Sequence, residues 1–445
     1  MKRTQRRVLG QLAGVGLLGF GLVLSAAPGA DAHSPGPLTP GGALPGLSHK
    51  LQNEFSTGQN EFEHEFTLAE GLGPTYNDKS CLNCHGTAGG IAGAGDTEGV
   101  GSPHNTIHIG LDNQGYYDPL RYEGGPLLDT VSINEDGASC SLGAATIPAN
   151  ANIVSHRHTP PVFGFGLIDA IPDAEILRRV NLGVDGVHGF ANWQNEMQAI
   201  DTPTAFFPPD QIFGYPRVGR FGWKAQTATL QQFSAEPFNG ELGVSTPFFP
   251  QEHTPQGVKF PADLPAGCDP ATTDPNDPDT SKAFDLYHFQ ALLAPPPRAY
   301  PSRESLFGEA LFDRTGCDTC HVPEMHTGPR YYMMNADGSS DRVPQLENQT
   351  VHAWSDFFDH DMGADLADDG GTTVGRVMGR ARGQHWRTTP LWGLRFKDAY
   401  LHDGRTTSVH EAIMAHGGEG QRARDRYAHL SPTEQQAIVS FLRTL

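Results

Sequence analysis

The sequence predicts a mainly α-helical protein made of two related domains with long irregular loops. Three observations lead to this fold class. The pattern Cys-x-x-Cys-His occurs twice, at residues 81–85 and 317–321. The segments that follow the two copies echo one another, which indicates a duplicated domain. The 53 glycines and 35 prolines among 445 residues indicate many turns between the helices.

Each Cys-x-x-Cys-His pattern is the signature of covalent haem c attachment. In the first copy the thiols of Cys81 and Cys84 would add to the haem vinyl groups, and His85 would bind the iron. The same roles in the second copy fall to Cys317, Cys320 and His321. A redox-active cysteine pair or half of a zinc site is the alternative, but neither explains the histidine that follows in both copies. We therefore expect two covalently bound haem c groups.

The N-terminus has the features of a cleavable signal peptide, residues 1–32. Four basic residues precede an apolar run over residues 8–27, and Ala30-Asp31-Ala32 matches a cleavage site. No later stretch is long and apolar enough to span a bilayer. We therefore expect a periplasmic or secreted protein without a membrane span.

The charge of the chain narrows the class of partner. The formal net charge is −20, and cleavage of the signal peptide would remove four positive charges. Such acidity disfavours nucleic acid and anionic lipid as partners. It is compatible with a small oxidant such as hydrogen peroxide and with a small electron-donor protein or small-molecule reductant.

Two cysteines, Cys140 and Cys268, are left over after haem attachment. In an oxidising compartment they can form a disulfide across a long loop. Two buried free thiols are the alternative.

The first half of the chain carries the first haem motif. Residues 33–48 form a Pro/Gly-rich leader, and residues 49–294 are expected to form the N-terminal haem domain. Phe55, Phe62 and Phe66 suggest a helix near the first haem, although Gly58 disfavours it. The glycine-rich stretch 89–95 is either a loop that uncovers an iron position or a plain connection.

The second half of the chain begins after a proline-rich segment. Within residues 245–281, the run Asp274-Pro-Asn-Asp-Pro-Asp has two interpretations, a calcium site or a solvated acidic loop. Residues 295–297 are three prolines, and the C-terminal haem domain is predicted over 299–445. Ser302 or Ser305 can cap the helix that leads to the second motif. Ser431 and Glu434 form a capping box for the final helix.

The two halves repeat one another beyond the haem motifs. The segment 157–164 resembles 387–393, and Trp223 precedes Leu230 by seven residues as His402 precedes Val409. This spacing indicates a duplicated domain with an insertion, about residues 173–218, in the first copy.

The repeat predicts a difference between the two irons. In the second copy a helix that starts after Ser408 carries Val409 and His416 on one face, so His416 is the candidate sixth ligand of the second haem. A buried histidine without a ligand role is the alternative. The equivalent residue in the first copy is Pro237, which cannot bind iron. The first haem is therefore expected to be open, or reached only by His104 or His108.

These motifs resemble those of the di-haem oxidoreductase family of peroxidase-like proteins, related to bacterial di-haem cytochrome c peroxidases. The resemblance covers about residue 50 to the end. It rests on both haem motifs and on four further segments. These are Gly71-Leu-Gly-Pro, Gly219-Arg-Phe-Gly-Trp-Lys-Ala, His360-Asp-Met-Gly and Leu401-His-Asp-Gly-Arg.

The resemblance implies two cytochrome c-like domains, a catalytic N-terminal haem and an electron-handling C-terminal haem. Trp223 aligns with a tryptophan that lies between the haems in the related peroxidases, although it can also be an ordinary core residue. Glu241 falls near their distal catalytic glutamate. His416 stands where they have a methionine ligand, so a bis-His haem of lower potential is expected here.

The sequence therefore favours an enzyme that reduces peroxide. The His85 haem would react, Glu241 or a loop histidine would move the proton, and the haem of His321 and His416 would relay electrons. Arg157, Arg387 and Arg405 would pair with haem propionates or polarise the site. Two alternatives stay open: oxygenase-type cleavage of an apolar substrate, and a pure electron-transfer cytochrome.

Overall fold

The computed structural model describes residues 40–86, 105–178, 184–194, 216–249, 255–258, 263–268, 281–368 and 375–445. The predicted signal peptide, the glycine-rich stretch 89–95, His104 and the acidic run that begins at Asp274 lie outside these residues, as does part of the predicted insertion. The described chain from residue 40 onward belongs to one compact unit. The predicted domain boundaries stay a prediction.

The prediction of a mainly α-helical fold is wrong. About 35% of the residues are helical and 16% are in strands, which form several small sheets. The largest sheet joins β2 (Asn105–Asn113), β3 (Tyr116–Asp118), β4 (Leu127–Leu128) and β6 (Ile153–His158), with β3, β4 and β6 all antiparallel to β2. In β6, Ile153, Ser155 and Arg157 are buried while the residues between them are less so, which is the alternation of a half-covered strand. No strand was predicted from the sequence in this region.

The remaining strands are short and form two-stranded ribbons between the helices. They are β1 (Thr75–Tyr76) with β5 (Val131–Ser132), β7 (Trp193–Gln194) with β8 (Arg217–Val218), β9 (Met325–His326) with β12 (Thr350–Val351), β10 (Tyr332–Met334) with β11 (Ser340–Arg342), and β13 (Asp359–Asp361) with β14 (His385–Arg387). These ribbons fix the ends of loops rather than build a continuous sheet.

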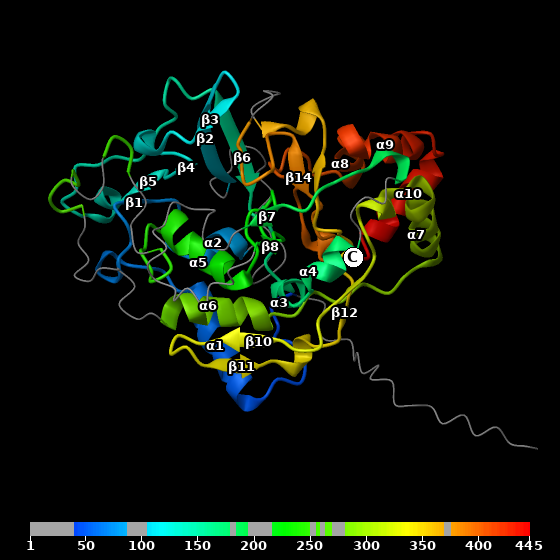
Figure 1. Cartoon of the computed structure of the whole chain (residues 1–445), viewed down its shortest axis with the longest axis horizontal. Helices are drawn as coiled ribbons and strands as arrows, with labels where there is room; N and C mark the ends of the chain where they lie inside the picture. The colour runs from blue at the N-terminus through cyan, green and yellow to red at the C-terminus, as the bar shows by residue number, and fades with distance from the viewer. Residues whose placement is uncertain are drawn as a thin grey trace, which may run out of the picture. The chain divides into compact units, whose positions relative to one another are not determined.

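The helices pack in two groups, one around each haem motif (Figure 1). The first group consists of α1 (His49–Glu63), α2 (Cys81–His85), α3 (Phe165–Asp169), α4 (Asp173–Leu177), α5 (Leu230–Gly240) and α6 (Ser281–Leu292). The second consists of α7 (Arg303–Thr315), α8 (Val409–Met414), α9 (Gln421–Ala428) and α10 (Pro432–Leu442). Each group has its own apolar core.

Glycine allows a close helix crossing in each group. Gly58 faces α6, where a Cβ would lie 2.0 Å from the Asp285 carbonyl oxygen. Gly308 of α7 faces α10, where a Cβ would lie 1.8 Å from the Ala437 carbonyl oxygen. The expected helix through Phe55 and Phe62 therefore forms despite Gly58, because packing against α6 outweighs the low helix propensity of glycine.

The predicted repeat is visible as matching turns. An isolated bridge joins Phe221 to Thr227 before α5, and another joins Tyr400 to Thr406 before α8. Each bridge begins nine residues before the first residue of its helix. The helices that start at Leu230 and Val409 are therefore structural equivalents, as the sequence spacing predicted.

The two copies also contact one another reciprocally. The Arg387 N–H donates to the Trp223 carbonyl oxygen at 2.9 Å, and the His158 N–H donates to the His402 carbonyl oxygen at 2.7 Å. Since Trp223 and His402 are equivalent in the repeat, these two hydrogen bonds are the same contact made twice. The two copies are thereby held together around a local two-fold relationship.

Candidate functional site

The second haem motif is presented by the C-terminal end of α7. The Ser302 side chain accepts from the Ser305 N–H at the start of this helix, which settles the cap as Ser302. Gly316 ends it in a left-handed conformation (φ 84°), and Cys317–Thr319 follow as one tight turn. The two thiols of the motif are thus held just beyond a rigid helix.

His321 and His416 face one another across a cavity that both of them line. Their ring centroids are 6.5 Å apart. Nδ1 of His321 lies 3.0 Å from the Trp354 carbonyl oxygen, and Nδ1 of His416 lies 2.8 Å from the Ala412 carbonyl oxygen. Because a carbonyl can only accept, each Nδ1 carries the proton and each Nε2 keeps its lone pair.

This arrangement fits one iron between two imidazoles. A metal–imidazole bond is about 2 Å long and the ring centroid lies about 1 Å behind the nitrogen, so two opposed imidazoles have centroids roughly 6 Å apart. A carbonyl behind Nδ1 is also the usual support of a metal-binding histidine. Burial lowers the pKa of His321 to about 4 and lowers that of His416, so both rings are neutral and able to bind metal.

The walls of this cavity fit the rest of a haem. They are mainly apolar, but the buried Arg387 and the half-buried Lys397 lie among them. Within the described chain neither cation has a carboxylate in ion-pair distance. Burial lowers the pKa of Arg387 to about 10 and that of Lys397 to about 8. A bound anion would stabilise the charged form of both side chains. Haem propionates are such anions.

Two of the three predicted propionate partners lie elsewhere. Arg157 pairs with Asp368 at 2.7 Å, and Arg405 pairs with Asp403 at 2.6 Å. Only Arg387 lines the cavity of the second motif. The sequence analysis missed Lys397, because an isolated lysine carries no signal of burial in sequence.

A buried histidine, His360, contacts the second haem motif at Cys320. His360 Nε2 lies 3.0 Å from Asp356, and its Nδ1 lies 2.8 Å from Glu419 and 3.8 Å from the Cys320 sulfur. Burial opposes protonation of His360, but the two carboxylates outweigh it and hold its pKa well above the ordinary value. Cys320, Asp356 and His360 are close enough to bind one metal ion, so the zinc alternative has a geometric basis here. That alternative leaves His321 and His416 unexplained.

The first haem motif forms the short helix α2, capped by the Ser80 side chain. Burial raises the pKa of the Cys81 thiol to about 12. The His85 ring lies 5.9 Å from the Phe62 ring, so α1 packs beside the motif as predicted. Cys81 and Leu82 pack against the core that contains Phe238 of α5.

Glu241 holds the loop that leads into this motif. Its carbonyl oxygen accepts from the N–H groups of Asn77 and Asp78, and its carboxylate accepts from the Asn77 side chain at 3.1 Å. Through these hydrogen bonds Glu241 stabilises the loop that precedes the first haem motif.

Glu236, one turn earlier on α5, is an acid that the sequence analysis missed. Its carboxylate accepts from Thr227 at 3.0 Å and from Gln232 at 3.1 Å. Burial raises the pKa of Glu236 to about 7, although these two hydrogen bonds and the nearby Arg376 charge stabilise the ionised carboxylate and lower the pKa. Its place one residue before Pro237, the repeat equivalent of His416, was the available signal.

His108, one of the two loop histidines considered as a ligand, lies on β2. Burial and the charge of Arg376 lower its pKa well below the ordinary value, so its ring is neutral. Its Nε2 lies 3.2 Å from the Thr106 hydroxyl, and its Nδ1 has no partner among the described residues. A neutral ring with a free nitrogen is able to bind iron.

Trp223 lies at the junction of the two repeats. Its indole Nε1 donates to the His158 carbonyl oxygen at 3.1 Å, and its ring lines the cavity of the second motif. Lys397 lies 5.9 Å from the centre of this ring. The described contacts place Trp223 beside the second haem site and join it to β6 of the first repeat.

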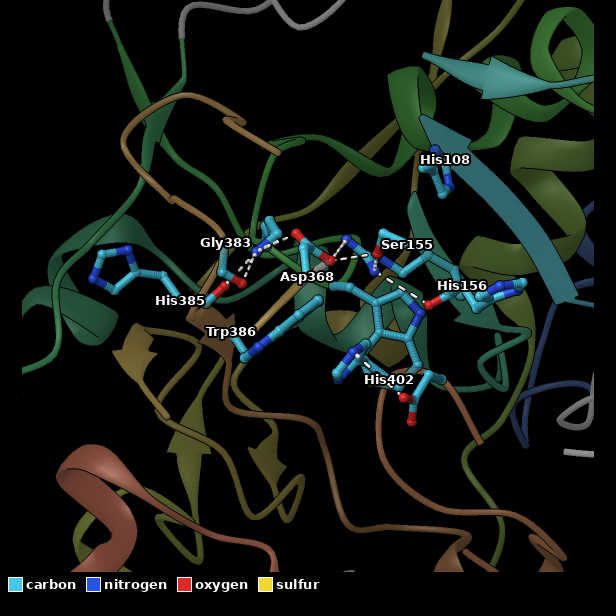
Figure 2. Close-up of polar contacts among 12 residues, drawn as sticks. His108, Ser155, His156, Asp368, Gly383, His385, Trp386 and His402 are labelled. Atoms are coloured by element: carbon cyan, nitrogen blue, oxygen red, sulfur yellow. Dashed lines mark hydrogen bonds and ion pairs between the residues drawn. The ribbon is translucent and has the colours of Figure 1, made fainter. Parts of the chain in front are cut away.

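A buried charged cluster lies next to this junction (Figure 2). Lys224 donates to three carbonyl oxygens, those of residues 382, 383 and 385, and lies 3.2 Å from Asp368. Trp386 packs against Lys224 at 3.8 Å and stacks on the His402 ring with centroids 3.8 Å apart. Burial opposes ionisation of Asp368, but Arg157 and Lys224 lower its pKa far below the ordinary value.

The paired motifs and the opposed imidazoles are the features of a haem-binding redox protein. Residues 137–445 match the family described as "Di-haem oxidoreductase, putative peroxidase". The chain belongs to this family, and the family predicted from the motifs is confirmed. Among the described residues, no helix has the length and apolar character needed to cross a membrane.

Two solved structures are similar to this chain at low level. Hydrazine synthase from Kuenenia stuttgartiensis, pressurised with 20 bar xenon, has a TM-score of 0.38 at 14% identity and covers 98% of this chain and 100% of its own. A MauG-like protein associated with microbial copper homeostasis has a TM-score of 0.36 at 14% identity, with coverages of 94% and 95%. Such TM-scores support no statement about fold or function. No curated protein matches the chain.

Proposed function

We propose that this di-haem oxidoreductase is a periplasmic or secreted peroxidase that reduces hydrogen peroxide at the first haem. Cys81 and Cys84 would attach that haem and His85 would bind it, while Cys317, Cys320 and His321 would do so for the second. Bound haem iron supplies the redox chemistry that cleaves the peroxide O–O bond. Arg387 and Lys397 would neutralise propionates at the second site.

The proposal rests on a difference between the equivalent helices α5 and α8 at the position of the candidate iron ligand. The position that holds His416 in the second repeat holds Pro237 in the first, and the residue before Pro237 is the half-buried Glu236, with a pKa of about 7. An iron position without a protein ligand on that helix is open to a small oxidant. A carboxyl group that exchanges its proton near pH 7 is suited to general acid–base catalysis.

Glu236 replaces Glu241 as the residue that we propose moves the proton. Its carboxylate would take a proton from the peroxide oxygen that binds first and return it to the leaving oxygen, which departs as water. Arg376 is buried near Glu236 and contributes positive charge. Glu241 instead is committed to Asn77 and the entry loop.

The alternative function with a specific observation in its favour is electron transfer alone. His108 has a neutral ring and a nitrogen without a partner among the described residues. If His108 binds the first iron, both haems are six-coordinate and peroxide has no entry. No described contact favours the oxygenase alternative.

Electron paramagnetic resonance of the resting ferric protein tests the proposal. We expect one high-spin and one low-spin haem, two haems retained after acid–acetone extraction, and consumption of peroxide when an electron donor is present. Two low-spin haems and no peroxide reaction in any redox state would establish the electron carrier instead. The His108→Ala variant then tests whether His108 is the sixth ligand of the first haem in such a carrier. If it is, the variant gains a high-spin signal; if it is not, both haems stay low-spin.

A further inference from the structure

A polar pocket of about 380 Å³ has His402 in its wall. Strand β6 and the turn 402–405 form its walls. The polar residues that line it are Asn152, Ser155, His156, Asp368, His402, Asp403 and Arg405. Figure 2 labels Ser155, His156, Asp368 and His402 of this wall, and also Trp386, on which the His402 ring stacks.

His402 belongs to both the pocket and the haem cavity. It lines the pocket with His156 and lines the cavity with His321 and Trp386. Its ring stacks on Trp386 at 3.8 Å between centroids and at an angle of 15°. A molecule in the pocket is therefore separated from the haem cavity by the His402 ring, which stacks on the Trp386 ring of the cavity wall.

The two imidazoles of the pocket are suited to hydroxyl groups. Burial and the nearby Arg157 lower the pKa of His402 to about 3, and burial lowers that of His156, so both rings are neutral. Nδ1 of His156 has no hydrogen-bond partner in the described part of the chain. A neutral imidazole nitrogen with a free lone pair accepts a hydrogen bond from a hydroxyl group.

The charges in the pocket wall are already compensated. Asp403 pairs with Arg405 at 2.6 Å, and Asp368 pairs with Arg157 at 2.7 Å and with Lys224 at 3.2 Å. A charged ligand would compete with these pairs, whereas a neutral ligand with hydroxyl groups would not. The pocket therefore favours a small, uncharged hydroxyl compound.

We propose that this pocket binds a small dihydroxy aromatic reductant of the hydroquinone class, whose electrons leave through the His402–Trp386 stack. The inference rests on the proposed peroxidase function, which supplies the oxidant. One hydroquinone loses two electrons and its two hydroxyl protons and becomes a quinone. One hydrogen peroxide takes up two electrons and two protons and becomes two water molecules.

Trp386 carries these electrons without becoming a stable radical cation. Lys224 lies 3.8 Å and Arg157 4.5 Å from the centre of its ring. Two cations at these distances destabilise a positive charge on the indole. Each electron therefore crosses the two stacked rings in a single step toward the second haem site.

Calorimetric binding of resorcinol to the holoprotein tests the pocket without turnover, because this dihydroxybenzene resists oxidation to a quinone. We expect binding to the parent, and binding at least 10-fold weaker in Val154→Trp, which fills the pocket beside the strand. Ile147→Trp, an exposed residue outside the pocket wall, is the matched control and should bind as the parent does. No binding to the parent, or equal binding to both variants, overturns the proposal.

Peroxide turnover with two donors provides the second measurement. The ratio of kcat/KM with hydroquinone to kcat/KM with ferrocyanide should be at least 10-fold lower in Val154→Trp than in the parent. Ferrocyanide serves as the reference donor because it needs no pocket. The His402→Phe variant keeps a ring to stack on Trp386 but should also bind resorcinol more weakly. If this ratio is the same in Val154→Trp as in the parent, the proposed electron route from the pocket is refuted. If the parent turns over with neither donor, the peroxidase proposal fails, and resorcinol binding still decides the pocket.

Discussion

His321 and His416 line one cavity with their ring centroids 6.5 Å apart. Backbone carbonyl oxygens hold both Nδ1 atoms, so each ring is fixed in the tautomer that binds metal. The two residues come from the second motif and from the end of α8, 95 residues later. One iron between them is the simplest occupant.

His416→Ala should convert the second haem from low-spin to high-spin. The variant removes the sixth ligand but leaves Cys317, Cys320 and His321, so two haems should still be retained per chain. Resting-state electron paramagnetic resonance would show the change. The matched control is His410→Ala on the same helix, because His410 contacts Tyr427 and should leave both signals as they are. A low-spin signal that survives intact in His416→Ala excludes His416 as a ligand.

Glu236→Gln should lower kcat/KM for peroxide by roughly 100-fold, because an amide cannot take up the peroxide proton. In the parent, this rate constant should rise with pH through about 7, as the Glu236 carboxyl loses its proton. The pH dependence should be flat in Glu236→Gln. Stopped-flow mixing with peroxide between pH 5 and 9 measures both effects. A parent rate constant without this pH dependence would assign the proton step to another group.

Glu241→Gln separates the two acids. It weakens the contact with Asn77 but leaves Glu236 in place, so the pH profile of peroxide reduction should keep its midpoint near 7. If Glu241→Gln abolishes the pH dependence and Glu236→Gln does not, the assignment is reversed.

The raised pKa of Glu236 also predicts a change of stability with pH. The folded state holds this proton up to about pH 7, whereas the unfolded chain releases it at the ordinary value near 4.5. The contribution to stability is therefore fully present below pH 4.5 and is lost as the pH rises through 7. Urea unfolding at pH 5 and pH 8 should show a smaller decrease for Glu236→Gln than for the parent.

Trp223→Phe should slow electron transfer between the haems while leaving both haem spectra nearly native. The substitution keeps a ring in the cavity wall but removes the hydrogen bond to the His158 carbonyl oxygen. The free energy of unfolding should fall by about 1 kcal/mol, as for one hydrogen bond. Rapid mixing with peroxide would follow oxidation of the second haem. An unchanged rate would make Trp223 a core aromatic and no more.

The Cys140–Cys268 disulfide is formed in this structure, which settles the alternative of two buried thiols. It closes a loop of 128 residues. Replacing both cysteines with alanine should lower the free energy of unfolding by about 5 kcal/mol on the chain-entropy model. Urea unfolding of the double variant, with haem content as a control for correct maturation, measures this. A loss below about 1 kcal/mol would show that other contacts already restrict the loop.

Local signals in the sequence predicted the parts of the fold that depend on neighbouring residues. The capping box of Ser431 and Glu434 starts α10, and the spacing of Val409 and His416 places His416 at the cavity although α8 itself ends at Met414. These features follow from helix geometry, which repeats over short distances. The sheet of β2 and β6 was missed because strands paired across 40 residues and more leave only a weak alternation in sequence.

The missed site residues were those whose character comes from burial. Glu236, Lys397 and Lys224 are ordinary charged residues in sequence, and only the folded chain shows that Lys224 is buried and that Glu236 and Lys397 are half-buried. Arg157 and Arg405 show the converse. Their sequence context suggested free cations, but Asp368 and Asp403 already neutralise them.

The reciprocal hydrogen bonds of Trp223 with Arg387 and of His402 with His158 have the form of a homodimer interface enclosed within one polypeptide. In a two-fold dimer each subunit offers the same surface to the other, and the contact is complete once two copies have met. Here both copies lie in one chain, so this surface is already used and is not available to a second molecule. A chain cut down to residues 299–445 would expose it again. The physical expectation is that such a half would be aggregation-prone or would pair with itself, and would restore in two chains the contact that the intact protein makes in one.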